Sequence, residues 1–169
     1  LPPDYDHKFL FSEIGYNLKI TDMQAALGLA QLKKLPQFTK SRQSNFAYLH
    51  KAISPFAKFL ELPIAEKHSD PSWFGYLITV REQAPFTRRE FIDYLHNHGI
   101  VTRMFLAGNV TKQPYFQTYA VPHRIGTAGL VNTDIVMNRS FWIGLYHGIT
   151  KEQRSHIAAT VQSFLRSYI

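Results

Sequence analysis

GYNLKITDMQAALGLAQLKKLPQF, Gly15 to Phe38, joins a polar turn to the start of a helix. In the turn, Gly15 permits a tight backbone path and Lys19 adds a positive charge just before the helix. Two more side chains of the turn can form hydrogen bonds, those of Tyr16 and Asn17. Backbone N–H groups and the dipole at a helix N-terminus favour an anion. The turn therefore predicts a phosphate-binding site.

The second half of this stretch predicts two consecutive helices. Thr21 followed by Gln24 forms a capping box, and apolar residues recur after it at helical spacing. Pro36 suits the first turn of a second helix, which continues with an apolar stripe of its own. Together they are expected to form one long, kinked helical arm.

Downstream, predicted strands alternate with predicted helices. The strands are Phe59–Pro63, Trp73–Val80, Ile100–Ala107 and Phe141–Leu145. Capping boxes at Thr87 and Thr150 begin two helices, a short helix is expected around 113–119, and Asn132 or Thr133 is expected to cap another. This order predicts an α/β sandwich of the α+β kind, with helices on a small sheet. Four aromatic residues are expected in its core: Trp73, Phe74, Phe141 and Trp142.

Composition limits the class of protein. The 169 residues, 45% of them hydrophobic, can bury one core. The net charge of +7 invites a nucleic-acid interpretation, but the basic residues are spread along the chain with only two adjacent pairs, so nucleic acid is not an expected partner. No apolar run is long enough to span a membrane, and the N-terminus does not resemble a signal peptide, which favours a cytoplasmic protein. Because the chain begins with Leu, we expect it to be a piece of a longer protein.

The chain lacks the residues that several kinds of chemistry need. There is no cysteine, so thiolate metal sites and cysteine nucleophiles are excluded within this chain. The pair His96 and His98 diverges on a helix and no HExxH pattern occurs, so no metal site is predicted. The GxSxG, P-loop and GxGxxG motifs are also missing.

The segment TRMFLAGNVTKQPYF, Thr102 to Phe116, predicts a ligand site at the end of a strand. Its polar candidates for substrate binding are Arg103, Asn109, Lys112, Gln113 and Tyr115, to which Tyr16 of the first turn is added. For Arg103 alone, a structural ion pair is as good an interpretation as ligand contact. A further polar and aromatic stretch is NTDIVMNRSFWIGLY, Asn132 to Tyr146.

Taken together, these segments resemble the DegT/DnrJ/EryC1/StrS family of sugar aminotransferases and dehydratases, which use pyridoxal phosphate. GYNLKITDMQAA is similar to that family's GYN-x-[RK]-x-[ST]-[DE]-x-QAA motif, and the likeness extends over essentially the whole chain. Four later segments are most similar to the CDP-4-keto-6-deoxy-D-glucose 3-dehydratase branch: SDPSWFGYLITV, APFTRREFIDYL, TRMFLAGNVTKQPYF and NTDIVMNRSFWIGLYHGIT.

The resemblance implies the C-terminal part of an enzyme with the aspartate-aminotransferase fold (fold type I). Residues 1–57 would be the terminal segment and interdomain helix, and residues 58–169 the small domain. The large pyridoxal-phosphate domain would precede them, with the catalytic base and the cysteines of a [2Fe-2S] cluster. No catalytic residue is then expected in this chain. The fragment alone is expected to be inactive.

Specific roles also follow from the resemblance. Asn17 and Lys19 would contact the phosphate of the pyridoxal or pyridoxamine cofactor across a homodimer. The substrate would be a nucleotide sugar, CDP-linked, that loses its C3 hydroxyl on the route to 3,6-dideoxyhexoses of lipopolysaccharide O-antigens. An iron–sulfur flavin reductase would supply two electrons.

Two other functions remain open from the sequence. The chain could be the C-terminal domain of a nucleotide-sugar aminotransferase, which the residue at the upstream lysine or histidine position would decide. It could also be a stand-alone binding module without catalysis.

Overall fold

Capping boxes begin three helices of the computed structural model. α1 (Asp22–Leu32), α3 (Arg88–Asn97) and α6 (Lys151–Arg166) each follow a threonine whose hydroxyl accepts from the backbone N–H three residues on. In each case the Glu or Gln at that position accepts in return from the backbone N–H of the threonine. The three capping boxes predicted from sequence are therefore confirmed.

The structure describes residues 13, 15–16, 18–105 and 107–169 and divides the chain into two compact units, 1–36 and 37–169. α1 belongs to the first unit, and a turn at Lys33 and Lys34 separates it from α2 (Leu35–Ile53). Almost all of α2 belongs to the second unit, because Leu49 and Ile53 are buried in the core beneath it. The compact unit thus starts earlier than the predicted small domain, 58–169.

The second unit contains one antiparallel sheet. Its strands are β1 (Leu60–Glu61), β2 (Gly75–Val80), β3 (Thr102–Met104) and β4 (Ser140–Gly144), in the order β1-β2-β4-β3. Short helices fill the connections: η2 (Ser54–Phe56), η3 (Val110–Lys112), α4 (Pro114–Thr118) and α5 (Val131–Arg139). Helices packed on a small antiparallel sheet confirm the predicted α+β sandwich.

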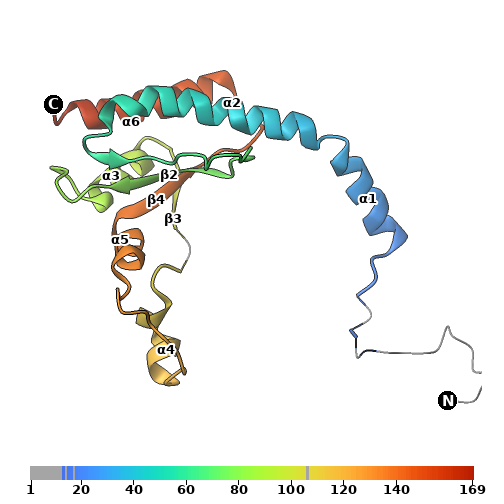
Figure 1. Cartoon of the computed structure of the whole chain (residues 1–169). Helices are drawn as coiled ribbons and strands as arrows, with labels where there is room; N and C mark the ends of the chain where they lie inside the picture. Colours follow the sequence, from blue (N-terminus) through green and yellow to red (C-terminus); the bar gives the residue numbers. More distant parts are fainter. Residues whose placement is uncertain (1–12, 14, 17, 106) are drawn as a thin grey trace, which may run out of the picture. The chain divides into compact units, whose positions relative to one another are not determined.

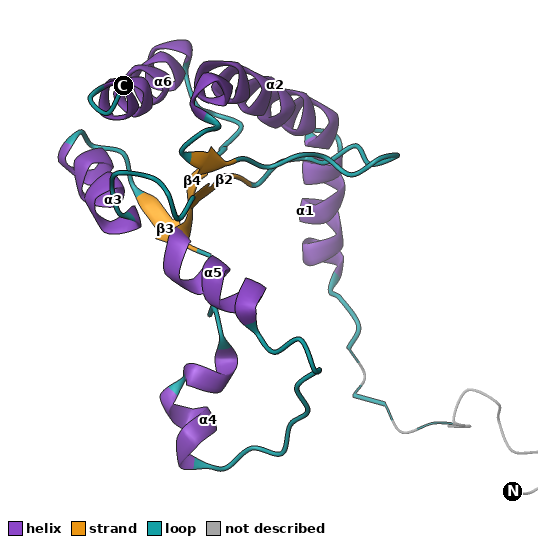
Figure 2. Ribbon diagram, turned by 60° about the vertical axis from the view of Figure 1, so that its left-hand side comes forward, coloured by secondary structure: helices purple, strands orange, loops and turns teal. Residues whose placement is uncertain are grey.

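α2, α3 and α6 cover one face of the sheet (Figures 1 and 2). α2 and α6 lie side by side, joined by a hydrogen bond of 2.9 Å from Gln162 Nε2 to the carbonyl of Ala52. Strand alternation points every second side chain at these helices. The core so formed contains Tyr76, Ile78, Val80, Phe141 and Ile143 from the strands and Phe91, Leu95, Val161, Phe164 and Leu165 from the helices. None of the described helices is long and apolar enough to cross a membrane.

Two local predictions are wrong. α5 starts at Val131 without a side-chain cap, although Asn132 or Thr133 was expected to cap it. Phe74 and Trp142 were expected in the core, but Phe74 precedes β2 and is 67% exposed, and Trp142 lies outside the core cluster. The predicted strand Ile100–Ala107 is confirmed only over its centre, as β3.

Candidate functional site

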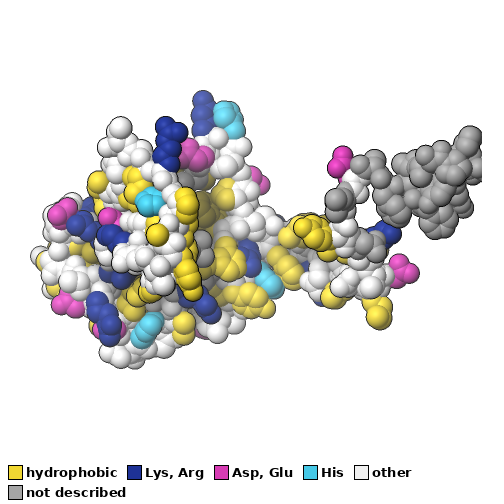
Figure 3. All heavy atoms as spheres, turned by 90° about the horizontal axis from the view of Figure 1, so that it is seen from below, with side chains coloured by type: hydrophobic (Ala, Val, Ile, Leu, Met, Phe, Trp, Pro, Cys, Tyr) yellow, Lys and Arg dark blue, Asp and Glu magenta, His cyan; other side chains and the backbone are white. Residues whose placement is uncertain are grey.

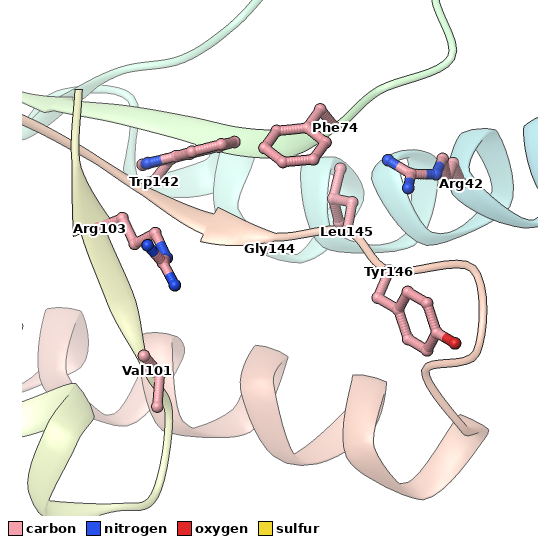
Figure 4. A pocket seen from close by; sticks show the side chains of 8 residues that line it. All are labelled: Arg42, Phe74, Val101, Arg103, Trp142, Gly144, Leu145 and Tyr146. Atoms are coloured by element: carbon pink, nitrogen blue, oxygen red, sulfur yellow. The ribbon is translucent and has the colours of Figure 1, made fainter. Parts of the chain in front are cut away.

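A pocket of about 300 Å³ opens beside α2 on the side of the sheet that carries Arg103 and Trp142, and its walls combine two arginines with aromatic rings. Arg42 comes from α2, Arg103 from β3, Trp142 from β4, and Phe74 and Tyr146 from the ends of strands. Figure 4 shows the two arginines on opposite sides of the pocket, with Phe74 and Leu145 between them. No carboxylate lines the pocket among the described residues. The arrangement suits an anionic ligand that also carries a flat ring.

Strand alternation places the pocket residues. Arg103 pairs with Trp142 across β3 and β4, while the flanking Phe141 and Ile143 point to the core. Gly75 makes room for the indole, because a Cβ at this position would lie 2.0 Å from Cε3 of Trp142. The indole therefore packs against Gly75 of β2, a placement that a larger residue at position 75 would obstruct.

Aromatic and cationic contacts organise the rim. The rings of Phe74 and Trp142 are 4.7 Å apart, and the guanidinium of Arg42 lies 5.6 Å from the centre of the Phe74 ring. Arg42 Nη1 also donates to the carbonyl of Trp73 at 3.3 Å. Nε1 of Trp142 is buried without a hydrogen-bond partner among the described residues. Hydrophobic side chains are exposed near basic ones on this side of the molecule (Figure 3).

The structure separates Arg103 from most of the other candidates of its segment. Asn109 is buried at 2% exposure and donates from Nδ2 to Oδ1 of Asp134 on α5 at 2.8 Å. Its Oδ1 accepts from the backbone N–H and the hydroxyl of Thr111, so that Asn109 caps η3. Lys112 forms an ion pair with the same Asp134 at 2.8 Å. Asn109 and Lys112 therefore fasten the segment after β3 to α5.

The remaining candidates lie outside the pocket. Gln113 donates from Nε2 to the carbonyl of Ala107 at 2.9 Å, and Tyr115 is half exposed in α4, edge-on to Phe116. Tyr16 and Lys19 are exposed in the first unit, just before the cap of α1. Asn17 lies outside the described residues. The described residues contain no group of three His, Asp or Glu side chains that could hold a metal ion.

The fastening of this segment to α5 is expected to depend on pH. Hydrogen bonds from Asn109, then from Lys112, hold the pKa of Asp134 below its ordinary value. A carboxylate with a lowered pKa stabilises the fold above its unfolded-state pKa, and this contribution disappears as pH falls through the lowered pKa. We expect the side-chain NH₂ signals of Asn109 in NMR spectra to shift in this acidic range and hydrogen exchange in 107–113 to become faster.

The Asp134→Asn variant should show fast exchange in 107–113 already at neutral pH. Asp93→Asn is the matched control, because Asp93 pairs with Arg89 of its own helix. Unchanged Asn109 signals in Asp134→Asn would contradict this account of the segment.

Sequence reasoning missed four pocket residues as ligand contacts: Arg42, Phe74, Trp142 and Tyr146. For Trp142 a signal existed, since strict alternation along β4 puts it on the face opposite Phe141 and Ile143. For Arg42 none existed, because its proximity to Phe74 depends on how α2 packs against the sheet.

Comparisons with known proteins show the family of the chain. A model described as the DegT/DnrJ/EryC1/StrS aminotransferase family matches residues 2–162. The chain is 46% identical over 97% of its length to "Lipopolysaccharide biosynthesis protein RfbH" of Salmonella typhimurium. It is 45% identical over 98% of its length to "dTDP-4-dehydro-2,6-dideoxy-D-glucose 3-dehydratase" of Saccharopolyspora spinosa.

The chain spans only 37% and 35% of the lengths of these two relatives. A solved structure, "E coli GDP-4-keto-6-deoxy-D-mannose-3-dehydratase with bound hydrated PLP", has the same fold: the TM-score is 0.78 over 95% of this chain and 40% of that chain, at 21% identity. The fold of the chain is therefore one part of the aminotransferase fold.

Proposed function

Because the chain belongs to the DegT/DnrJ/EryC1/StrS aminotransferase family, we propose that it is the C-terminal part of a nucleotide-sugar 3-dehydratase. The proposed reaction is removal of the C3 hydroxyl of CDP-4-keto-6-deoxyglucose in the synthesis of 3,6-dideoxyhexoses for lipopolysaccharide O-antigens. The observation that carries the proposal is identity of 46% and 45%, along nearly the whole chain, to a lipopolysaccharide biosynthesis protein and a sugar 3-dehydratase. Such an enzyme is cytoplasmic.

The proposed longer protein has a large domain before this chain. Residues 1–57 then form the terminal segment and interdomain helix, and residues 58–169 the small domain. The large domain carries the catalytic base and the [2Fe-2S] cluster, since this chain has no cysteine. An iron–sulfur flavin reductase is the proposed electron donor.

The pocket between Arg42 and Arg103 is the proposed contact for the nucleotide sugar. A diphosphate carries negative charge and paired oxygens, to which guanidinium groups can donate bidentate hydrogen bonds. The exposed rings of Phe74 and Tyr146 add flat apolar surface for a base or a sugar. Asn109, Lys112, Gln113 and Tyr115 lie outside this pocket, and they are proposed to assist substrate binding from the segment that follows β3.

Cofactor binding is proposed for the turn before α1. Lys19 is an exposed cation two residues before the N-cap Thr21 of an 11-residue helix, and such a position fits a phosphate group. Asn17 and Tyr16 would donate hydrogen bonds beside it. When bound, pyridoxamine phosphate supplies an electron sink that allows the C3–O bond to break. Lys19 would hold the phosphate as a point charge, without transferring a proton.

A homodimer is the proposed assembly, because α1 exposes apolar side chains that a partner could cover. Four of them are between 60% and 82% exposed: Met23, Leu27, Leu29 and Leu32. Several large apolar side chains exposed on one helix are typical of an interaction surface. In this arrangement, each turn 15–19 contributes to the cofactor site of the other subunit.

The division between this chain and a large domain predicts a difference in cofactor binding. At micromolar pyridoxal phosphate, we expect the isolated chain to show no absorbance band of bound cofactor, because it holds only the phosphate contacts. The longer protein should show the band at one cofactor per subunit. Tight stoichiometric binding by the isolated chain would contradict the proposal.

The reaction itself separates the proposed function from its main alternative. A dehydratase removes the oxygen at C3 of the 4-keto sugar. An aminotransferase of the same family would leave that oxygen in place and add an amino group at C4. The family model alone is compatible with both, and the name of the 45% identical relative favours the dehydratase.

A further inference from the structure

A second pocket lies between α2 and α6, apart from the pocket of Arg103, and it is lined by basic and hydroxyl side chains. Its volume is about 360 Å³, and its residues come from α2, from the loop that leads into α6 and from the first turn of α6. The basic members are Lys40, Lys151 and Arg154, together with the imidazole of His147. The hydroxyl and amide members are Gln37, Ser41, Ser44 and Asn45.

Helical spacing explains why these groups converge. Gln37, Ser41 and Ser44 recur at intervals of three and four along α2 and therefore share one face of it. Arg42, which lines the other pocket, lies outside this face. From the opposite side, Lys151 and Arg154 are three residues apart in the first turn of α6. The two helices thus direct both sets of side chains into one hollow.

Arg154 is held in place by protein contacts before any ligand arrives. Its Nη1 donates to Ser44 Oγ at 3.2 Å and to Asn45 Oδ1 at 3.4 Å, and its guanidinium lies 4.3 Å from the centre of the Tyr48 ring. Asn45 is 5% exposed and is itself held by a hydrogen bond of 3.1 Å to the carbonyl of Tyr146. Such pre-organisation lowers the entropic cost of binding.

The pocket offers more donors than the protein uses. No carboxylate lines it, and the ion pairs recorded among the described residues involve none of its cations. Nε of Arg154 is buried without a hydrogen-bond partner among those residues. His147 is fixed by stacking on Phe38, with ring centroids 3.7 Å apart. An excess of fixed donors and positive charge is the environment that a phosphate group prefers.

We propose that this pocket is a phosphate-binding site, separate from the substrate pocket, that takes an inorganic phosphate ion or the terminal phosphate of a small ester. Lys40 on α2 and Lys151 on α6 neutralise the negative charge of the phosphate. Arg154 donates its remaining N–H groups to the phosphate oxygens, and the serine hydroxyls complete the hydrogen bonds. The proposal does not depend on the reaction proposed above, because no residue of the Arg103 pocket takes part.

The test is a titration of the chain with sodium phosphate at constant ionic strength, followed by ¹H–¹⁵N NMR spectra and calorimetry. We expect saturable binding of one phosphate, with the largest shifts at the amides of 147–154 and 37–45. The Lys40→Gln, Lys151→Gln double variant should bind at least about tenfold more weakly. Both lysines are exposed, so the variant should keep the fold, which circular dichroism checks.

The control is the Lys51→Gln, Lys67→Gln double variant, which removes the same charge outside the pocket. It should bind phosphate within about twofold of the unchanged chain, since distant exposed charges are screened by salt. Equal weakening by both variants would mean nonspecific attraction and would overturn the proposal. So would shifts centred on Arg103, or an absence of saturation.

Cytidine monophosphate is a second probe that distinguishes the source of the phosphate. Equal effects of the lysine variant on both ligands would support a site for the phosphate group alone. Binding of the nucleotide that ignores the lysine variant and depends on Arg103 would assign the nucleotide to the other pocket, while phosphate binding here would still support the proposal.

Discussion

Replacing Phe141 with alanine is expected to lower the free energy of unfolding by about 3–5 kcal/mol, the usual cost of removing a fully buried ring. Phe141 is 0% exposed in the middle of β4, and its ring packs edge-on against Phe91 of α3 at 5.3 Å. Its removal leaves a cavity where the sheet meets the helices. Urea unfolding followed by circular dichroism measures the effect, and a loss of this size is a large share of the stability of a small domain.

Phe74→Ala is the matched control. It removes the same ring from a position 67% exposed, so the expected loss is below about 1 kcal/mol. Comparison of the two variants tests whether Phe141 lies in the core and Phe74 on the surface, as in the structure. Similar losses for both variants would mean that Phe74 is also in the core, as the sequence pattern alone suggested.

Replacing Arg103 with alanine in the longer protein is expected to reduce kcat/KM for the nucleotide sugar by about 10- to 100-fold, the effect of losing a hydrogen bond to a charged group at about 1.5–3 kcal/mol. Arg103 lines the pocket and has no recorded ion-pair partner among the described residues, so its guanidinium is free for a diphosphate. Steady-state kinetics measure the change. Arg103→Lys should recover only part of it, because an ammonium lacks the bidentate fork.

Arg124→Ala provides the control for Arg103, because Arg124 is exposed in the loop between α4 and α5 and lines none of the pockets described above. It removes the same charge and should leave kcat/KM within about twofold. If Arg103→Ala behaved like Arg124→Ala, the pocket would not be the substrate site.

Features that depend on neighbours in the chain could be predicted from the sequence. The threonine caps at positions 21, 87 and 150 each act on a residue three positions away, so the sequence contains both partners. Gly99, in the left-handed conformation at φ 76°, ends the third helix where the sequence predicted an end. The alternation of β4 likewise identifies its buried side.

Features that depend on distant parts of the chain could not be predicted. Nothing near Asn109 in the sequence indicates that its side chain donates a hydrogen bond to Asp134, 25 residues away, and lies outside the pocket. The exposure of Phe74 depends on where β2 starts pairing with β4, which is at Gly75, two residues later than the aromatic run suggests. Of the candidates in 102–116, only Arg103 could be recognised as a pocket residue, because strand pairing alone fixes its direction.

If this chain completes a sugar 3-dehydratase, as proposed, the product of the longer protein will show it. The protein would be incubated with CDP-4-keto-6-deoxyglucose, pyridoxamine phosphate and a reduced iron–sulfur reductase, and the sugar analysed by mass spectrometry and NMR. We expect a 4-keto sugar that has lost its C3 oxygen, formed only when the electron donor is present. A 4-amino sugar that keeps its C3 hydroxyl, formed with an amino acid as the amine donor, would contradict it.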